Sequence, residues 1–96
     1  MEIINIEVLH MFARKNSGLR NIASAWESIV SDSEWNQRKD VIKSFPRVDF
    51  NSRHDAYIFN LGGNFRLIAQ ITFSAGYVKI LDVLNHDEYL KWSNRG

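Results

Sequence analysis

The only proline of the chain, Pro46, divides it into two parts whose apolar residues are spaced differently. Before Pro46, apolar side chains recur at the spacing of helices that bury one face. After it, apolar and polar side chains alternate, which indicates strands of a sheet with one buried face. Helices followed by strands, without regular alternation of the two, predict an α+β fold.

The helical part predicts two helices that pack as a hairpin. A first helix is expected over about residues 5–15, after a short strand at residues 2–4, and Ser17 is the expected N-cap of the second helix. The apolar positions at helical spacing that indicate the first helix are Ile4, Val8, Met11 and Phe12, and those that indicate the second are Leu19, Ile22, Ala23, Trp26, Ile29 and Val30. Residues 40–45 predict one more helical turn, which Pro46 ends.

The strand-like part predicts an antiparallel meander. Its strands are expected over residues 57–61, 65–73 and 77–84, and Gly62-Gly63 suits a tight hairpin because glycine tolerates positive φ. Residues 86–92 predict a short helix or turn. The predicted fold is therefore an N-terminal helical hairpin packed on a mainly antiparallel sheet, with a short C-terminal helix.

Alternation assigns side chains to the two faces of the sheet. In the middle strand one face holds Phe65, Leu67, Ala69, Ile71 and Phe73, and the other holds Arg66, Ile68, Gln70 and Thr72. In the last strand, alternation places Asp82 on the same face as Val78, Ile80 and Leu84. A buried carboxylate needs a partner, whereas a β-bulge would turn it outward, and the sequence leaves both interpretations open.

Composition limits the class of protein. With 96 residues, 45% of them hydrophobic, the chain is expected to form one domain, residues 1–96. It has no cysteine and its histidines lack the spacing of a zinc motif, so we expect no metal and no small-molecule cofactor. A net charge of +1 gives no overall attraction to nucleic acid. Without a long apolar run or signal peptide, the chain is predicted to be cytoplasmic and not bound to a membrane.

Several separated blocks of residues resemble one protein family. The blocks are Phe59-Asn60-Leu61-Gly62-Gly63-Asn64, Arg66-Leu67-Ile68 and His86-Asp87-Glu88-Tyr89, together with Trp35 and residues 40–49. In their order and spacing they resemble HigB-type toxins, which are mRNA interferases of type II toxin–antitoxin systems and are related to the RelE fold. The resemblance extends over nearly the whole chain.

The resemblance implies a RelE-like fold and an endoribonuclease that cuts mRNA, usually in the decoding site of the ribosome. It implies that the ribose 2′-hydroxyl attacks its own phosphate without a metal ion. It also implies a HigA-type helix-turn-helix antitoxin as partner, which neutralises the toxin and represses the operon.

The chain also departs from the family pattern. A single residue separates Asn64 from Arg66, where many relatives have two. Leu81 stands where relatives often have arginine, and Asn85 where threonine is common. Lys79, which alternation places on the same face as Leu81, is a candidate to supply the missing charge. An alternative function is therefore a non-catalytic or degenerate toxin-like module that binds an antitoxin or RNA, and a third is a plain fold with an unrelated ligand.

Arg66 is the first candidate for a catalytic residue. Its guanidinium offers bidentate hydrogen bonds to a phosphate and stays charged at every relevant pH. It lies on the less apolar face of its strand. The other interpretation is an ion pair with a carboxylate at the edge of the sheet.

His86 and Tyr89 complete the predicted catalytic set. His86 would lie at a strand end, and a histidine can give a proton to a leaving 5′-oxygen near neutral pH. Alternatively, it caps a helix by bonding to Asp87 or Glu88. Tyr89 shares a helical face with His86, and it would stack on a base, orient the phosphate, or simply be a half-buried core residue.

The segment from Arg38 to His54 is the most basic part of the chain. Such a run can follow an RNA backbone, although it is commonly just a solvated surface. The residues predicted to bind RNA are Lys39, Lys43, Arg47, Arg53, Lys79 and Lys91. Of the tryptophans, Trp26 is expected in the core, and Trp35 and Trp92 are candidates for a partner surface.

Overall fold

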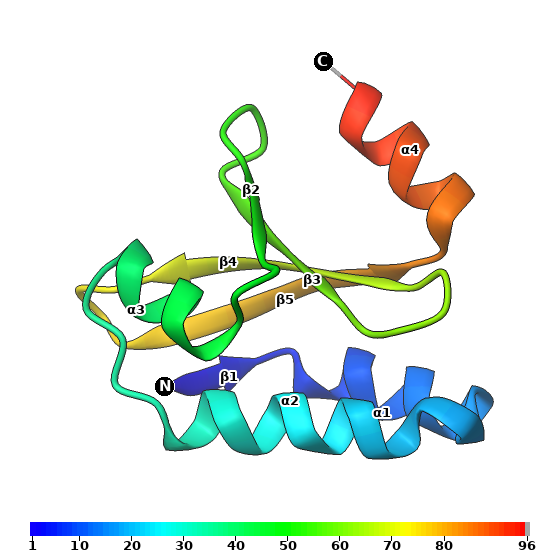
Figure 1. The fold of residues 1–96 in the computed structure, drawn as a ribbon, viewed down its shortest axis with the longest axis horizontal. Helices are drawn as coiled ribbons and strands as arrows, with labels where there is room; N and C mark the ends of the chain where they lie inside the picture. The colour runs from blue at the N-terminus through cyan, green and yellow to red at the C-terminus, as the bar shows by residue number, and fades with distance from the viewer. Residues whose placement is uncertain (96) are drawn as a thin grey trace.

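A five-stranded sheet with the strand order β1-β5-β4-β3-β2 organises the fold (Figure 1). The structure is a computed structural model that describes residues 1–95. The strands are β1 (Glu2–Ile4), β2 (Asp49–Asn51), β3 (Ala56–Asn60), β4 (Arg66–Thr72) and β5 (Tyr77–Leu84). The helices are α1 (Ile6–Lys15), α2 (Arg20–Asp32), α3 (Arg38–Ser44) and α4 (His86–Asn94), and a 3₁₀ turn spans Ser17–Leu19. The predicted α+β class, helical hairpin and C-terminal helix are confirmed.

The sheet is antiparallel except at one edge. Strands β2 to β5 each pair antiparallel with their neighbours in sequence, as expected for a meander. The first strand instead pairs parallel with the last, so that Ile3 lies opposite Val78. Strands β3, β4 and β5 are therefore inner strands, and β1 and β2 form the two edges.

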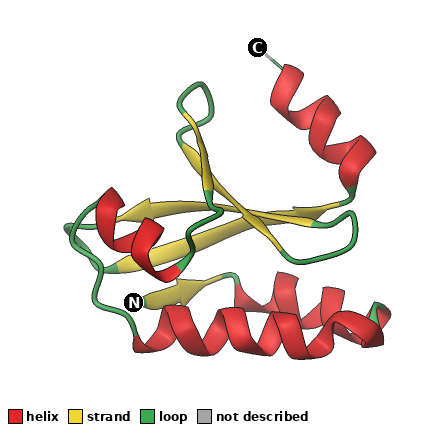
Figure 2. Cartoon of the chain, in the orientation of Figure 1, coloured by secondary structure: helices red, strands yellow, loops and turns green. Residues whose placement is uncertain are grey.

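The two faces of the sheet are covered differently (Figure 2). On one face, which we call the helical face, α1 and α2 lie side by side and bury the main core. Over the other, which we call the open face, α4 rises from the end of β5 (Figure 1). A second, small cluster lies there and consists of Ala56, Ile58, Ile68 and Leu84, with Tyr89 and Trp92 of α4 packed against it.

The helical hairpin forms as predicted, although three of the apolar residues that predict it, Met11, Ile22 and Ile29, are exposed. Its buried residues are Leu9 and Phe12 of α1 and Ala23, Trp26 and Val30 of α2. The N-cap prediction is wrong, because Ser17 begins the 3₁₀ turn and Leu19 is the cap residue of α2. The Leu19 N–H donates to the Asn16 carbonyl at 2.9 Å, so a tight 3₁₀ turn leads directly into the helix.

No helix in residues 1–95 combines the length and apolar character that crossing a bilayer requires.

A β-bulge in β5 explains the position of Asp82. Along β5, Ile80 lies opposite Ala69 of β4. The next pair of opposite residues is Asp82 and Ile68, so Leu81 is an extra residue on β5. The bulge interpretation is therefore confirmed, and Asp82 is exposed.

The extra residue reverses the alternation of the side chains that follow it. Val83 packs against the main core on the helical face, and Leu84 joins the small cluster on the open face. Simple alternation from Ile80 would have placed them the other way round. In β4, which has no extra residue, Leu67 and Ala69 lie in the main core and Ile68 on the open face, as predicted.

The turn between β3 and β4 depends on its glycines. Gly62 and Gly63 have φ values of 86° and 54°, as the glycine pair predicts, and residues other than glycine rarely adopt such backbone angles. Gly62 also lies close to α2, because a Cβ atom there would be 3.0 Å from Cδ1 of Ile22. The turn is thereby packed against the helical hairpin.

Two elements of the middle segment differ from the prediction. Helix α3 begins at Arg38, two residues earlier than expected, and packs Val41 into the main core. Strand β2 was not predicted, because its three residues, Asp49–Asn51, are too few to show alternation. It is formed by pairing with β3, in which Phe50 lies opposite Tyr57.

Candidate functional site

Arg66 is the first residue of β4, an inner strand. Its partner on β5 is Leu84, a member of the open-face cluster, and directly opposite residues share a face of a sheet. Within residues 1–95, the ion pair that the structure shows joins His10 to Glu27, so the Arg66 guanidinium has no carboxylate partner there. The alternative of an ion pair at the sheet edge therefore does not hold. The guanidinium is half-buried and available to an anion.

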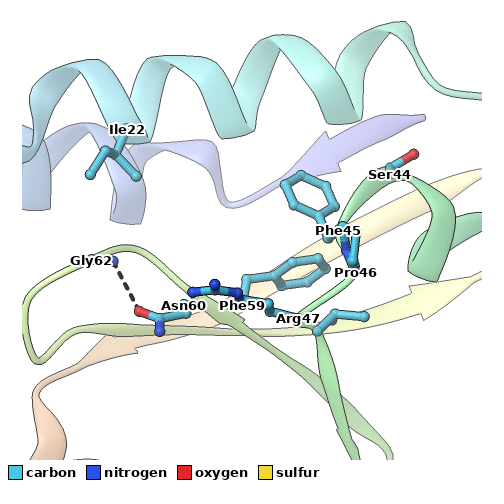
Figure 3. Close-up of a pocket in the computed structure, with 9 residues that line it drawn as sticks. Ile22, Ser44, Phe45, Pro46, Arg47, Phe59, Asn60 and Gly62 are labelled. Atoms are coloured by element: carbon cyan, nitrogen blue, oxygen red, sulfur yellow. Dashed lines mark hydrogen bonds between the residues drawn. The ribbon is translucent and has the colours of Figure 1, made fainter.

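Asn60, at the end of β3, connects the turn to Arg66. Its Oδ1 atom accepts a hydrogen bond from the Gly62 N–H at 3.0 Å (Figure 3) and one from Nη1 of Arg66 at 3.5 Å. The same Nη1 atom donates to the Phe65 carbonyl at 3.3 Å. No role for Asn60 is predicted from the sequence, although an asparagine shortly before glycine is typical of an Asx turn. Both acceptors belong to one hairpin, which orients the guanidinium.

Tyr89 lies beside Arg66, as the predicted catalytic set requires. The Cζ atom of Arg66 is 5.9 Å from the centroid of the Tyr89 ring, within the range of a cation–π interaction. Tyr89 is half-buried against the open-face cluster, which holds its ring near the sheet. The structure thus joins residues of β4 and α4 that are distant in the sequence.

His86 is the first residue of α4 and is exposed. The helix is capped by Asn85 and Glu88 instead: the Glu88 N–H donates to Asn85 Oδ1 at 2.8 Å, and the Asn85 N–H donates to Glu88 Oε1 at 3.0 Å. The capping role considered for His86 is therefore wrong. The imidazole projects from a first turn that the capping box makes rigid.

A row of stacked rings extends from Tyr89 across α4. Tyr89 and Trp92 stack with centroids 6.1 Å apart, and Trp92 stacks on His54 with centroids 4.2 Å apart. His54 belongs to the turn between β2 and β3, and its carbonyl accepts a hydrogen bond from Gln70 Nε2 at 3.3 Å. The turn is thereby held over the open face. Sequence spacing does not reveal this contact, because His54 precedes β3 and Trp92 follows β5, so that three strands separate them in the chain.

The predicted RNA-binding residues divide between the two sides of the sheet. On the open face, Lys79 lies opposite Gln70, and Lys91 lines a hollow beside Trp92. Arg53 is exposed in the β2–β3 turn, next to His54. These residues lie on the side of the sheet where Arg66 and Tyr89 meet.

The remaining members of the predicted set lie on the helical side. Lys39 and Lys43 are exposed on α3, one helical turn apart, so they do share a face. Arg47 follows α3 and lines a groove beside Ile22 of α2. The structure therefore separates these residues from Arg66.

The tryptophans have distinct roles. Trp26 is buried in the core, as predicted. Trp35 is also buried, and its Nε1 atom donates to the Ser44 hydroxyl at 3.0 Å, so the suggestion that it marks a partner surface is wrong. Phe45, which follows α3, packs edge to face against its ring with centroids 6.1 Å apart, and its sequence position did not indicate this contact. Trp92 is half-buried in the stacked row.

The arrangement suits an anionic, aromatic ligand. Arg66 offers hydrogen-bond donors and charge to a phosphate, and Tyr89 offers a ring face to a base. His86 supplies a group able to move a proton. A nucleic acid strand carries both kinds of group, a phosphate and an aromatic base.

Comparison with known proteins decides the family. Residues 20–92 match the family model described as HigB toxin, the RelE-like toxic component of a toxin–antitoxin system. This chain belongs to the HigB toxin family. No individual curated protein matches it. The matched region runs from the first residue of α2 to Trp92 in α4, so it contains every residue of the candidate site.

Family membership confirms the predicted resemblance and the RelE-like α+β fold. It also establishes the class of the protein as the toxin of a toxin–antitoxin pair, and hence an antitoxin as its partner.

Proposed function

We propose that this HigB toxin is an endoribonuclease that cleaves mRNA, with Arg66, His86 and Tyr89 as its catalytic set. The observation that carries the proposal is the half-buried guanidinium of Arg66, which has no carboxylate partner in residues 1–95 and lies 5.9 Å from the Tyr89 ring. A cation beside an aromatic face is suited to a phosphate and its neighbouring base.

In the proposed reaction, the 2′-hydroxyl of a ribose gives its proton to solvent water, its oxygen attacks the adjacent phosphorus, and the bond from phosphorus to the 5′-oxygen breaks. The products are a 2′,3′-cyclic phosphate and a new 5′-hydroxyl end. Arg66 stabilises the negative charge that develops on the phosphoryl oxygens. His86 donates the proton that the leaving 5′-oxygen needs. Following the family resemblance, no metal ion takes part.

The register of the sheet supports His86 in this role. Arg66 lies opposite Leu84, and His86 follows Leu84 by two residues, so both groups extend from the same end of the sheet. The capping box of Asn85 and Glu88 fixes the turn that carries the imidazole. A general acid held in a fixed orientation loses little conformational entropy when it donates its proton to the leaving group.

The open face provides the path proposed for the mRNA. Lys79, Lys91 and Arg53 place positive charge around Arg66 and the stacked rings. On the opposite side, Lys39 and Lys43 would contact ribosomal RNA if cleavage takes place in the decoding site. A HigA-type helix-turn-helix antitoxin is the proposed inhibitor. Because translation occurs in the cytoplasm, the proposal includes a cytoplasmic location.

The test is induced expression in bacteria with primer extension on a translated mRNA. Wild type should arrest growth and produce new cleavages inside the reading frame. Arg66→Ala and His86→Ala should each lower cleavage by roughly 100-fold, the effect typical of losing one charge-stabilising or proton-donating group. Arg14→Ala, which changes an exposed arginine of α1, is the matched control and should behave as wild type.

The other outcomes separate the alternatives. Folded Arg66→Ala and His86→Ala variants that still cleave would place the chemistry elsewhere. Wild-type protein that is folded yet causes neither arrest nor cleavage would favour a degenerate toxin that only binds its antitoxin or RNA. One observation favours this second function: Leu81, where relatives often have arginine, places an apolar side chain that is 38% exposed on the bulge of β5.

A further inference from the structure

An open groove lies on the helical side of the sheet (Figure 3). It is bounded by α2, by the segment after α3 and by the β3–β4 turn, and its volume is about 430 Å³. Its walls include Ile22, Phe45, Pro46, Arg47, Asn60 and Gly62. We propose that this groove binds the antitoxin, through a segment that inserts an apolar side chain and presents a carboxylate to Arg47. This inference rests on the proposed function of a toxin with an antitoxin inhibitor.

The walls of the groove favour an apolar side chain. Ile22, on the α2 side, is 41% exposed although it is a large aliphatic residue. Ile29 is also 41% exposed and lies two turns further along the same helix, so the apolar surface continues past the groove along α2. Exposed apolar residues grouped around a hollow indicate a protein contact more than scattered ones do.

The charge of the groove selects the kind of segment that binds. Among the described residues that line it, Arg47 is the one charged side chain, and it is exposed. An arginine at the rim of an apolar hollow pairs well with a carboxylate, which it can bind in a bidentate manner. The complementary segment therefore has an apolar anchor flanked by Asp or Glu.

The aromatic residues of the groove are poorly suited to a nucleobase. Phe59 is only 1% exposed, and its ring packs edge to face with Phe45 at 5.0 Å and with Trp26 at 5.5 Å. Stacking of a base requires a free ring face, which these contacts do not leave on Phe59. A protein side chain, which needs only apolar walls, fits the groove better than RNA does.

The groove also reaches the candidate catalytic arginine. Asn60 lines the groove, and its Oδ1 atom accepts hydrogen bonds from the Gly62 N–H and from Arg66. A segment bound in the groove therefore touches the residue that orients the guanidinium, without having to cover the open face. Binding at this place would inhibit cleavage by disturbing Arg66.

The groove by itself is too small to hold a stable complex, since specific protein interfaces bury at least about 1,200 Å² in total. It would act as the central anchor of a larger contact that follows Ile22 and Ile29 along α2. Such anchors contribute a large share of binding energy, which makes single substitutions informative.

The test measures the affinity of the purified toxin for the antitoxin encoded beside it, by calorimetry or surface plasmon resonance. Ile22→Glu and Arg47→Glu should each raise Kd roughly tenfold or more, as expected for anchor residues. The matched controls are Ile42→Glu, at an isoleucine that is 44% exposed, and Arg14→Glu, at an exposed arginine of α1. Both controls should leave Kd within about twofold. Thermal unfolding verifies that each variant is folded.

Three results would overturn the inference. Groove and control variants with equal affinity would place the antitoxin elsewhere. A wild-type dimer that Ile22→Glu dissociates, with antitoxin affinity unchanged, would assign the groove to a second copy of this chain. Crosslinking of RNA to the groove, lost in Arg47→Glu while antitoxin affinity is retained, would assign it to RNA. Failure of the wild-type toxin to bind the antitoxin at all would instead contradict the proposed function.

Discussion

Nη1 of Arg66 lies 3.5 Å from Oδ1 of Asn60, the residue directly opposite it on β3. The same oxygen accepts the Gly62 N–H at 3.0 Å, so the asparagine side chain cannot rotate away without also losing its hydrogen bond to the turn. The proposed catalytic guanidinium is therefore oriented by two strands, and a change at Asn60 should affect catalysis without touching the RNA.

Substitutions of Asn60 should separate two effects on Arg66: the orientation of its guanidinium by a hydrogen bond, and the effect of a negative charge placed beside it. Asn60→Ala removes both hydrogen bonds, and we expect slower mRNA cleavage with a loss of about 1 kcal/mol in the free energy of unfolding. Asn60→Asp keeps the acceptor but sets a carboxylate beside Arg66, where it competes with the phosphate. We expect this variant to be more stable than Asn60→Ala and yet to cleave more slowly, as measured by thermal unfolding and primer extension.

The matched control is Asn64→Asp, at an exposed residue of the same turn. It adds the same charge without the contact to Arg66, so it should cleave faster than Asn60→Asp. Equal cleavage by the two variants would mean that charge near the turn, and not the Asn60–Arg66 contact, controls the rate.

Substitutions of Tyr89 should distinguish its ring from its hydroxyl. The 5.9 Å approach of Arg66 to the ring requires only the aromatic face, which Tyr89→Phe retains. We expect Tyr89→Phe to cleave nearly as fast as wild type. Tyr89→Leu should lose the cation–π contribution of about 1 kcal/mol, which corresponds to roughly fivefold in rate. A Phe variant as slow as the Leu variant would show that the hydroxyl group takes part.

Replacing His54 by phenylalanine should cost less stability than replacing it by alanine. Its Nε2 atom is buried without a hydrogen-bond partner among residues 1–95, while its ring stacks on Trp92 at 4.2 Å. His54→Phe keeps the stack and removes the unsatisfied atom, so the free energy of unfolding should stay level or rise. His54→Ala should lose about 1 kcal/mol by losing the stack. Urea denaturation checks this, and a Phe variant less stable than the Ala variant would contradict it.

The cap of α4 should matter to both stability and cleavage. Asn85→Ala removes the acceptor of the Glu88 N–H, which costs about 1 kcal/mol at an N-cap and frays the turn that carries His86. Asn85→Thr keeps a capping oxygen and should remain close to wild type. Urea denaturation and the primer-extension assay measure the two effects. If Asn85→Ala cleaves at the wild-type rate, the position of His86 on a rigid turn is unimportant.

Local patterns predicted those features that neighbouring residues decide. Leu67 and Ala69 were assigned to one face of β4 and Arg66 to the other, because alternation along a regular strand follows from the backbone itself. The positive φ of Gly62 followed equally from residue type. The same logic misplaced Leu84, which it grouped with Val78 and Ile80, because a bulge is decided by how β5 pairs with β4 and cannot be seen in the sequence of β5 alone.

The candidate site was predicted only in part for a similar reason. Arg66, His86 and Tyr89 could be named from residue chemistry and family resemblance. Asn60 and His54 could not, because the role of each comes from a contact, with Arg66 in one case and Trp92 in the other. Trp35 was misjudged because its burial depends on α3 and its neighbours closing over it.

The sequence by itself determined the α+β class, the order of the elements, the hairpin turn and the chemical types of the site residues. Each of these depends on periodicity or backbone preference within a few residues. Tertiary structure alone decided the parallel pairing of β1 with β5, the bulge at Leu81, the orientation of Arg66 by Asn60, and the groove beside Ile22. These features require segments distant in the chain to meet, and their energies exist only after the sheet and its helices have packed.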